Sequence, residues 1–174
     1  MTERVKAGVV LPRPPDDPGE WLSDAVAFEA AGADALWVEH GAAPSLDPLT
    51  LTAALAALTY RSILVVAVPH TPAPQVLATV ERLSRGRLTL IAGAEADGES
   101  RVRHSGDGTY EEDGAGRWVS VAVPTGRAAW RETLRLAAER GDHGVLVPAD
   151  ARLLDLLRNP EDPGGRHDLQ LAQG

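Results

Sequence analysis

The feature that most constrains the fold is a regular alternation of short apolar runs with longer amphipathic segments. Residues 63–68 (ILVVAV) form a continuous apolar run, which is typical of a strand buried on both faces of a parallel sheet. Further strands are predicted at 5–11, 35–38 and 87–92, with helices between them at 20–31, 49–58 and 74–83. This strict strand–helix alternation predicts an α/β protein with a parallel sheet.

The helix ends carry recognisable signals. The first helix has apolar residues at helical spacing and stops at Gly32, a residue suited to the position after a helix. Asp47 and Pro48 are expected to form the N-cap and first turn of the second helix, and Asp150 is expected to cap the last one. These signals place the helices between the strands.

The second half of the chain is less regular. Residues 93–116 are rich in glycine and charge, so we expect a long flexible loop, and residues 159–174 are expected to form a loose tail. Strands at 118–123 and 145–147, with helices at 127–140 and 151–157, complete the pattern. The sequence therefore predicts one domain over residues 1–174 with about six strands.

Two units of the chain echo one another. Trp21 and Gly32 are followed by Val38 at the same spacings at which Trp130 and Gly141 are followed by Val147. The echo indicates either a repeated strand–helix unit or only the likeness that any two such units share. The four tryptophans are expected to be packing residues.

Composition excludes several kinds of chemistry. The chain has no cysteine, so disulfides, thiolate catalysis and cysteine-bound metals are ruled out. The net charge is −8, and the basic residues are scattered along the sequence, so we expect small molecules or proteins as partners, and no nucleic acid. An apolar block of membrane-spanning or signal-peptide type is absent, and we therefore expect a cytoplasmic protein without membrane contact.

Four stretches together resemble the bacterial luciferase-like flavin monooxygenase family. They are FEAAGADALWVEH at 28–40, DPL at 47–49 followed by AALAALT, Arg61 leading into ILVVAVP, and ATVERLSRGRLTLIAGA at 78–94. The resemblance covers residues 5–94, and LSRGRL is its most specific part. It implies a TIM-barrel-like fold, here truncated, and an oxidoreductase that uses FMN, another reduced flavin or a deazaflavin on a small organic substrate.

The resemblance also suggests site residues. Glu39 and His40 match the family's E-H-H motif, in which the first histidine is implicated in acid–base chemistry, although Gly41 replaces the second. Ala67 and Val68 correspond to a strand bulge under the flavin ring. His70 and Thr71 occupy the rearranged stretch that follows, and they are the other candidate cofactor-binding residues.

Length leaves other functions open. A complete eight-unit barrel needs about 250 residues, and no glycine-rich phosphate motif followed by a helix is visible here. Two alternatives to a flavin-dependent oxidoreductase therefore remain. One is a non-catalytic relative that binds flavin or serves as a partner subunit, and the other is a cofactor-free enzyme. Because six strands would leave open edges, we expect a homodimer or a pair with a related subunit.

The remaining polar candidates have simpler interpretations. His104 with the acids Glu111, Glu112 and Asp113 could ligate a metal, but clustered acids in a glycine-rich segment are usually solvated, so no metal site is predicted. His143 precedes the last strand, at the end of such folds that serves stability, and is expected to be structural.

Overall fold

A computed structural model of the chain describes residues 4–12, 17–39, 46–68, 70–92 and 102–160. It is a mixed α/β structure whose strands are β1 (Lys6–Leu11), β2 (Ala35–Val38), β3 (Ile63–Val68), β4 (Leu88–Ala92), β5 (Val102–Gly106), β6 (Thr109–Glu112), β7 (Gly116–Ser120) and β8 (Gly144–Pro148). The helices are α1 (Gly19–Ala31), α2 (Pro48–Leu58), α3 (Pro74–Ser84), α4 (Arg127–Glu139) and α5 (Ala151–Arg158). Every strand and helix expected from the sequence is present, with modest differences at the ends.

The strands form a closed ring in chain order, in which β8 returns to pair with β1. Neighbours are parallel except where β6 pairs with β5 and with β7. The junction between β4 and β5 consists of one residue pair, Ile91 with Val102. The expectation of about six strands is therefore wrong, because two further strands complete the ring.

Those two strands lie in the segment that we expected to be a long loop. β5 and β6 form a hairpin whose turn residues, Asp107 and Gly108, have φ angles of 49° and 70°. Positive φ at both central positions is the signature of a type I′ turn, which matches the twist of paired strands. Residues 93–101 of the expected loop and 161–174 of the expected tail lie outside the described residues.

Side chains of the strands alternate between two clusters. The inner one joins Ala35, Trp37, Val65, Val102, Trp118 and Leu146, one or two from each of several strands around the ring. Trp37 meets Tyr110 and Trp118 edge-on, with ring centroids 4.9 and 5.7 Å apart. The middle of the ring is therefore a packed core, as in other small barrels.

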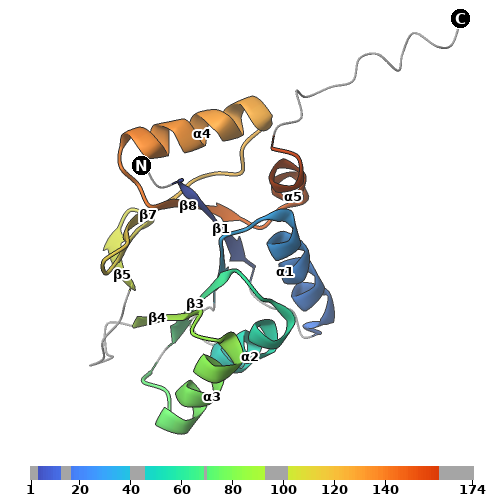
Figure 1. The fold of residues 1–174 in the computed structure, drawn as a ribbon, viewed down its shortest axis with the longest axis vertical. Helices are drawn as coiled ribbons and strands as arrows, with labels where there is room; N and C mark the ends of the chain where they lie inside the picture. Colours follow the sequence, from blue (N-terminus) through green and yellow to red (C-terminus); the bar gives the residue numbers. More distant parts are fainter. Residues whose placement is uncertain (1–3, 13–16, 40–45, 69, 93–101, 161–174) are drawn as a thin grey trace, which may run out of the picture.

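The outer cluster packs the strands against the helices. It includes Val9, Leu36, Leu64 and Val66 from the strands, and Trp21 and Trp130 from α1 and α4 are buried within it. Figure 1 shows the helices arranged around β1 to β4 and β8, with no helix beside β5. Short turns join β5 to β6 and β6 to β7, so no helix lies between these strands.

The two echoing units have the same construction. Gly32 and Gly141 both end their helices with positive φ, at 109° and 71°. The residue after each glycine donates its backbone N–H to the last turn of the helix. Asp47 and Asp150 cap α2 and α5 as expected, accepting from Thr50 N and Arg152 N, each at 2.7 Å.

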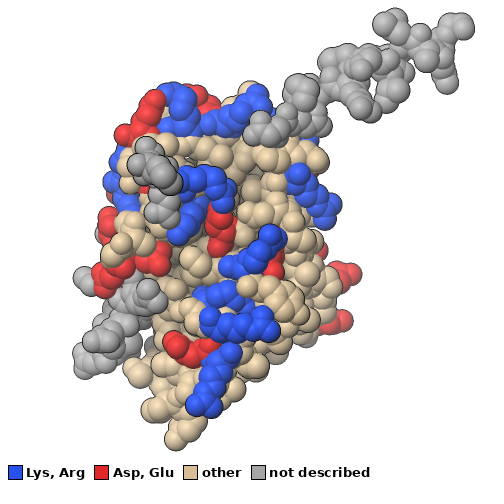
Figure 2. Space-filling model, viewed as in Figure 1, with Lys and Arg blue, Asp and Glu red and all other residues tan. Residues whose placement is uncertain are grey.

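Charged side chains are numerous on the surface. Figure 2 shows Lys and Arg in a band down one face, with carboxylates beside several of them. Some of these charges are paired, since Arg4 contacts Asp34 at 2.6 Å and both Arg117 and Arg140 bind the buried carboxylate of Asp142. Within the described residues, none of the helices combines the length and apolar character that crossing a membrane requires.

Candidate small-molecule site at the carboxyl ends of the strands

Parallel strands bring their carboxyl ends to one rim of the ring, where ligands of α/β proteins commonly bind. A hollow of about 460 Å³ opens there between β1, β2, β7 and β8. We call it the mouth hollow; its walls include Val10, Pro12, Glu39, Ser120, Val121, Leu146, Pro148 and Ala149. This volume is in the range of small-molecule pockets, and the walls are mostly apolar with two polar groups.

Glu39 is the charged group of the mouth hollow. It follows the buried end of β2 and is itself exposed. Burial, and after it the Glu39 carboxylate, raises the pKa of Tyr110 above its ordinary value of 10.0. Tyr110 is therefore within electrostatic reach of Glu39, although it is not among the residues that line the mouth hollow.

Sequence reasoning missed Tyr110 because it lies in the expected loop. The signal that could have found it is Asp107–Gly108 between two short segments, since Asp-Gly is among the strongest local indications of a β-hairpin. The hairpin pairs Tyr110 with Trp118 of β7. That pairing places the phenol ring in the inner cluster, against Trp37.

Below the mouth hollow the ring interior is closely packed. A Cβ atom added to Gly8 would lie 2.6 Å from Leu146 Cδ2 and 3.2 Å from Trp37 Nε1. Within the described chain the buried Nε1–H of Trp37 has no hydrogen-bond partner. A ligand at this end of the ring would therefore rest above the tryptophan layer rather than enter it.

The candidate flavin-binding residues do not gather at one place. Successive strand residues face opposite sides, so Ala67 follows Val65 toward the inside while Val68 joins the outer cluster. The β3–β4 register runs from Leu64 to Val68 without a shift. His70 and Thr71 are exposed and line a different hollow of about 370 Å³, beside the start of α2 and α3.

Of the candidate catalytic pair, the structure places one residue. Glu39 lies in the wall of the mouth hollow, and His40 lies outside the described residues. The side chain of His104 also lies outside the described part of the structure.

The acidic cluster around β6 divides by face. Glu111 and Asp113 are exposed as expected, but Glu112 accepts a hydrogen bond from Trp118 Nε1 at 2.8 Å. His143 packs edge-on against the same indole and places Nε2 3.9 Å from the Glu112 carboxylate. The expectation of a wholly solvated cluster is thus wrong for Glu112. No group of three potential metal ligands occurs within the described ranges.

The fold and this rim together define a mixed α/β barrel with a hollow of about 460 Å³ at the carboxyl ends of its strands. Comparison of the chain with models of known protein families and with curated proteins finds no match.

Proposed function

We propose that the mouth hollow binds the ring system of a flavin and that the chain acts there as a compact luciferase-like oxidoreductase, of the monooxygenase type, on a small organic substrate. The observation that carries this proposal is the position of Glu39, from the E-H motif, in the wall of an apolar hollow at the strand ends. The resemblance over residues 5–94 supplies the cofactor class.

The lining of the mouth hollow suits the ring system of a flavin better than the phosphate of FMN. The apolar side chains of Val10, Val121, Leu146 and Pro148 fit a flat aromatic ring. None of the described residues that line the hollow is Lys or Arg, so the phosphate of FMN has no cationic partner there. The ring rather than the phosphate would provide the affinity.

A bound flavin would supply the redox chemistry. The chain would position the ring against the apolar wall, and Glu39 would accept a hydrogen bond at its edge. His40, next in the motif, is the proposed acid–base residue, since an imidazole of ordinary pKa can take and give a proton near neutral pH.

The test is a titration of the full chain with riboflavin and with FMN, followed by flavin fluorescence. We expect binding of both at concentrations up to about 1 mM, with dissociation constants within about threefold, because the lining offers nothing to the phosphate. Ala122→Trp, which fills the hollow from an exposed position, should abolish binding. Ala128→Trp, exposed on α4 away from the hollow, is the matched control, and equal loss in both variants would contradict the proposal.

A second candidate function is favoured by the same lack of a cation in the lining. The hollow would then bind a neutral organic molecule without flavin, in a non-catalytic protein, a partner subunit or a cofactor-free enzyme. Absence of binding by both riboflavin and FMN at about 1 mM would favour this candidate.

A further inference from the structure

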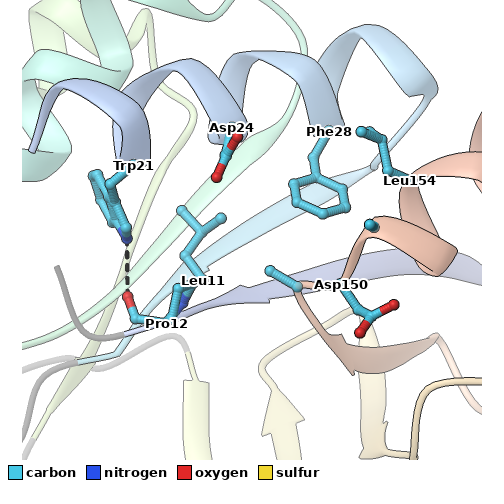
Figure 3. A pocket seen from close by; sticks show the side chains of 9 residues that line it. Leu11, Pro12, Trp21, Asp24, Phe28, Asp150 and Leu154 are labelled. Atoms are coloured by element: carbon cyan, nitrogen blue, oxygen red, sulfur yellow. Dashed lines mark hydrogen bonds between the residues drawn. The ribbon is translucent and has the colours of Figure 1, made fainter. Parts of the chain in front are cut away.

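A separate pocket of about 230 Å³ lies between α1 and α5. It shares only Leu11, Pro12 and Ala149 with the mouth hollow. The backbone hydrogen bond from Ala149 N to Val10 O, 2.9 Å long, ties the strand ends together along this shared wall. Figure 3 shows the pocket under α1, with Trp21, Asp24 and Phe28 reaching down from the helix.

The interior of this pocket is apolar and aromatic. Trp21 and Phe28 are buried, with exposures of 3% and 4%, and Leu11 and Leu154 complete the apolar surface. The indole N–H of Trp21 is already used, since it donates to Pro12 O at 2.9 Å (Figure 3). The small part of these rings that reaches the pocket therefore offers apolar surface to a ligand, and the indole N–H is not free to hydrogen-bond it.

The charged groups of the pocket are both carboxylates. Asp150 is engaged as the cap of α5. Asp24 is an exposed residue at the opening of the pocket; it projects from α1 between Trp21 and Phe28 and, in the described part of the chain, has no hydrogen bond or ion pair. No Lys or Arg is among the described residues of the lining. An anion would be repelled there, whereas a cation would find an available carboxylate beside aromatic rings.

We propose that the α1–α5 pocket binds a small organic ammonium ion, with its apolar body against Trp21, Phe28 and Leu154 and its ammonium group at Asp24. The size agrees, because an apolar cavity of about 150 Å³ holds benzene, and 230 Å³ leaves room for one ring and an aminomethyl group. The net charge of −8 also favours the approach of a cation.

The experiment compares three probes of the same shape and different charge: benzylammonium, benzyl alcohol and benzoate. Binding to the full chain is measured by calorimetry and by the NMR signal of the Trp21 indole N–H. We expect benzylammonium to bind at least about tenfold more tightly than benzyl alcohol, and benzoate not to bind. Equal affinity for the amine and the alcohol, or no amine binding at about 10 mM, would overturn the proposal.

Two variants of α1 test whether the preference for the amine comes from the Asp24 carboxylate. Asp24→Asn should remove the preference for the amine while leaving the weak binding of benzyl alcohol, because only the carboxylate is lost. Glu20→Gln makes the same charge change at an exposed position of the same helix, outside the lining, and should bind like the original chain. Loss of the preference in both variants would show a general charge effect and would contradict the site.

A third variant locates the pocket. Ala151→Trp places a bulky side chain at its edge, from a position that is exposed, and should block all three probes. Thermal unfolding of each variant checks that the fold is kept. The test does not depend on flavin, since a failure of flavin binding in the mouth hollow leaves these outcomes unchanged.

Discussion

A single buried carboxylate joins two elements at the amino end of the barrel. Glu29 is buried on α1 and its carboxylate accepts the backbone N–H groups of Tyr60, Arg61 and Ser62 at 2.8 to 3.0 Å. Burial acts to raise the pKa of Glu29, but these backbone hydrogen bonds outweigh it, so the pKa lies below the ordinary 4.5. One carboxylate thereby joins α1 to the segment that enters β3.

A lowered pKa in the folded state gives a definite pH dependence. The stabilisation from Glu29 is complete above the unfolded value of about 4.5 and is lost as the pH falls through the folded pKa. Glu29→Gln should lower the free energy of unfolding at pH 7 by about 1–3 kcal/mol, and the difference between the two chains should shrink below pH 4.5. Urea unfolding at several pH values measures it, with Glu20→Gln as control. A difference that is constant with pH would contradict this role.

Gly144 of β8 packs against the Trp118 indole, where there is no space for a side chain. A Cβ atom there would lie 2.3 Å from Trp118 Cζ3 and 3.0 Å from Lys6 O. Gly144→Ala should therefore destabilise the chain by about 1–3 kcal/mol through overpacking. A double-mutant cycle with Trp118→Leu, measured by urea unfolding, should show that the alanine is less harmful once the indole is removed. Additive effects would locate the strain elsewhere.

His40 is the residue whose substitution tests the proposed chemistry. If flavin binds and turnover is measurable, His40→Ala should reduce turnover by about 100-fold, as for a lost acid–base group, and leave thermal unfolding unchanged. Steady-state kinetics with reduced flavin provide the measurement. Unchanged turnover would remove His40 from the mechanism.

At the level of elements, the sequence predicted correctly those features that depend on residues close together in the chain. The strand 63–68, the cap at Asp47 and the helix stops at Gly32 and Gly141 depend on neighbouring residues, and the structure confirms them. The strand β6 (TYEE) has no apolar alternation, and it is held by pairing with β5 and β7. Glu112 lies on the same face of β6 as Tyr110 and accepts a hydrogen bond from Trp118 Nε1 on the next strand, a partner that becomes apparent only once β6 and β7 are recognised as paired strands.

The candidate site was predictable to a similar degree. Glu39 could be placed at a strand end from the strand pattern alone, whereas its neighbour Tyr110 comes from the unforeseen hairpin. For Ala67 and Val68 the resemblance suggested a shared place under the flavin ring, whereas the unshifted β3–β4 register places them on opposite faces of β3. What the sequence could not indicate is which loops meet at the rim, because that follows from how the ring closes.

The β5–β6 turn offers a direct test of the hairpin. Gly108 has φ 70°, and a Cβ there would lie 3.1 Å from Ser120 Cβ. Gly108→Ala should therefore weaken the hairpin, with faster amide hydrogen exchange in β6 and a loss of about 1 kcal/mol in unfolding free energy. Gly126→Ala, where a Cβ meets nothing within 4 Å, is the control. Unchanged exchange in β6 would mean that the turn does not hold the hairpin.

For the whole molecule, closure of the ring changes the argument for self-association. Among the described strands, the open sheet edges that led us to expect a homodimer are reduced to the β4–β5 junction, which one residue pair holds, because β5 and β6 complete the ring and β8 pairs with β1. Large apolar side chains are nevertheless exposed at Leu58, Tyr60 and Leu83, on or after α2 and on α3. A dimer would have to use such a helical surface rather than strand edges.

Light scattering at micromolar concentration tests the dimer. We expect a mass of twice 18.4 kDa for the original chain, and a shift toward the monomer for Leu58→Glu, since a buried charge opposes an apolar interface. Thr79→Glu, exposed on α3, is the charge-matched control. A mass of 18.4 kDa over the whole concentration range would defeat the expectation.

The pairing of β1 with β8 also bears on the order of events during translation. β8 ends roughly 140 residues after β1, and at about 5–20 residues per second its synthesis follows by roughly 7 to 28 seconds. Throughout that interval the β8-facing side of β1 is unpaired, and once β4 has been made the nascent chain carries a sheet of β1 to β4 with this edge open, a template for unwanted strand addition. Release from the ribosome before residue 144 would leave this edge open for good, so incomplete chains of this protein should be the ones that aggregate or recruit chaperones.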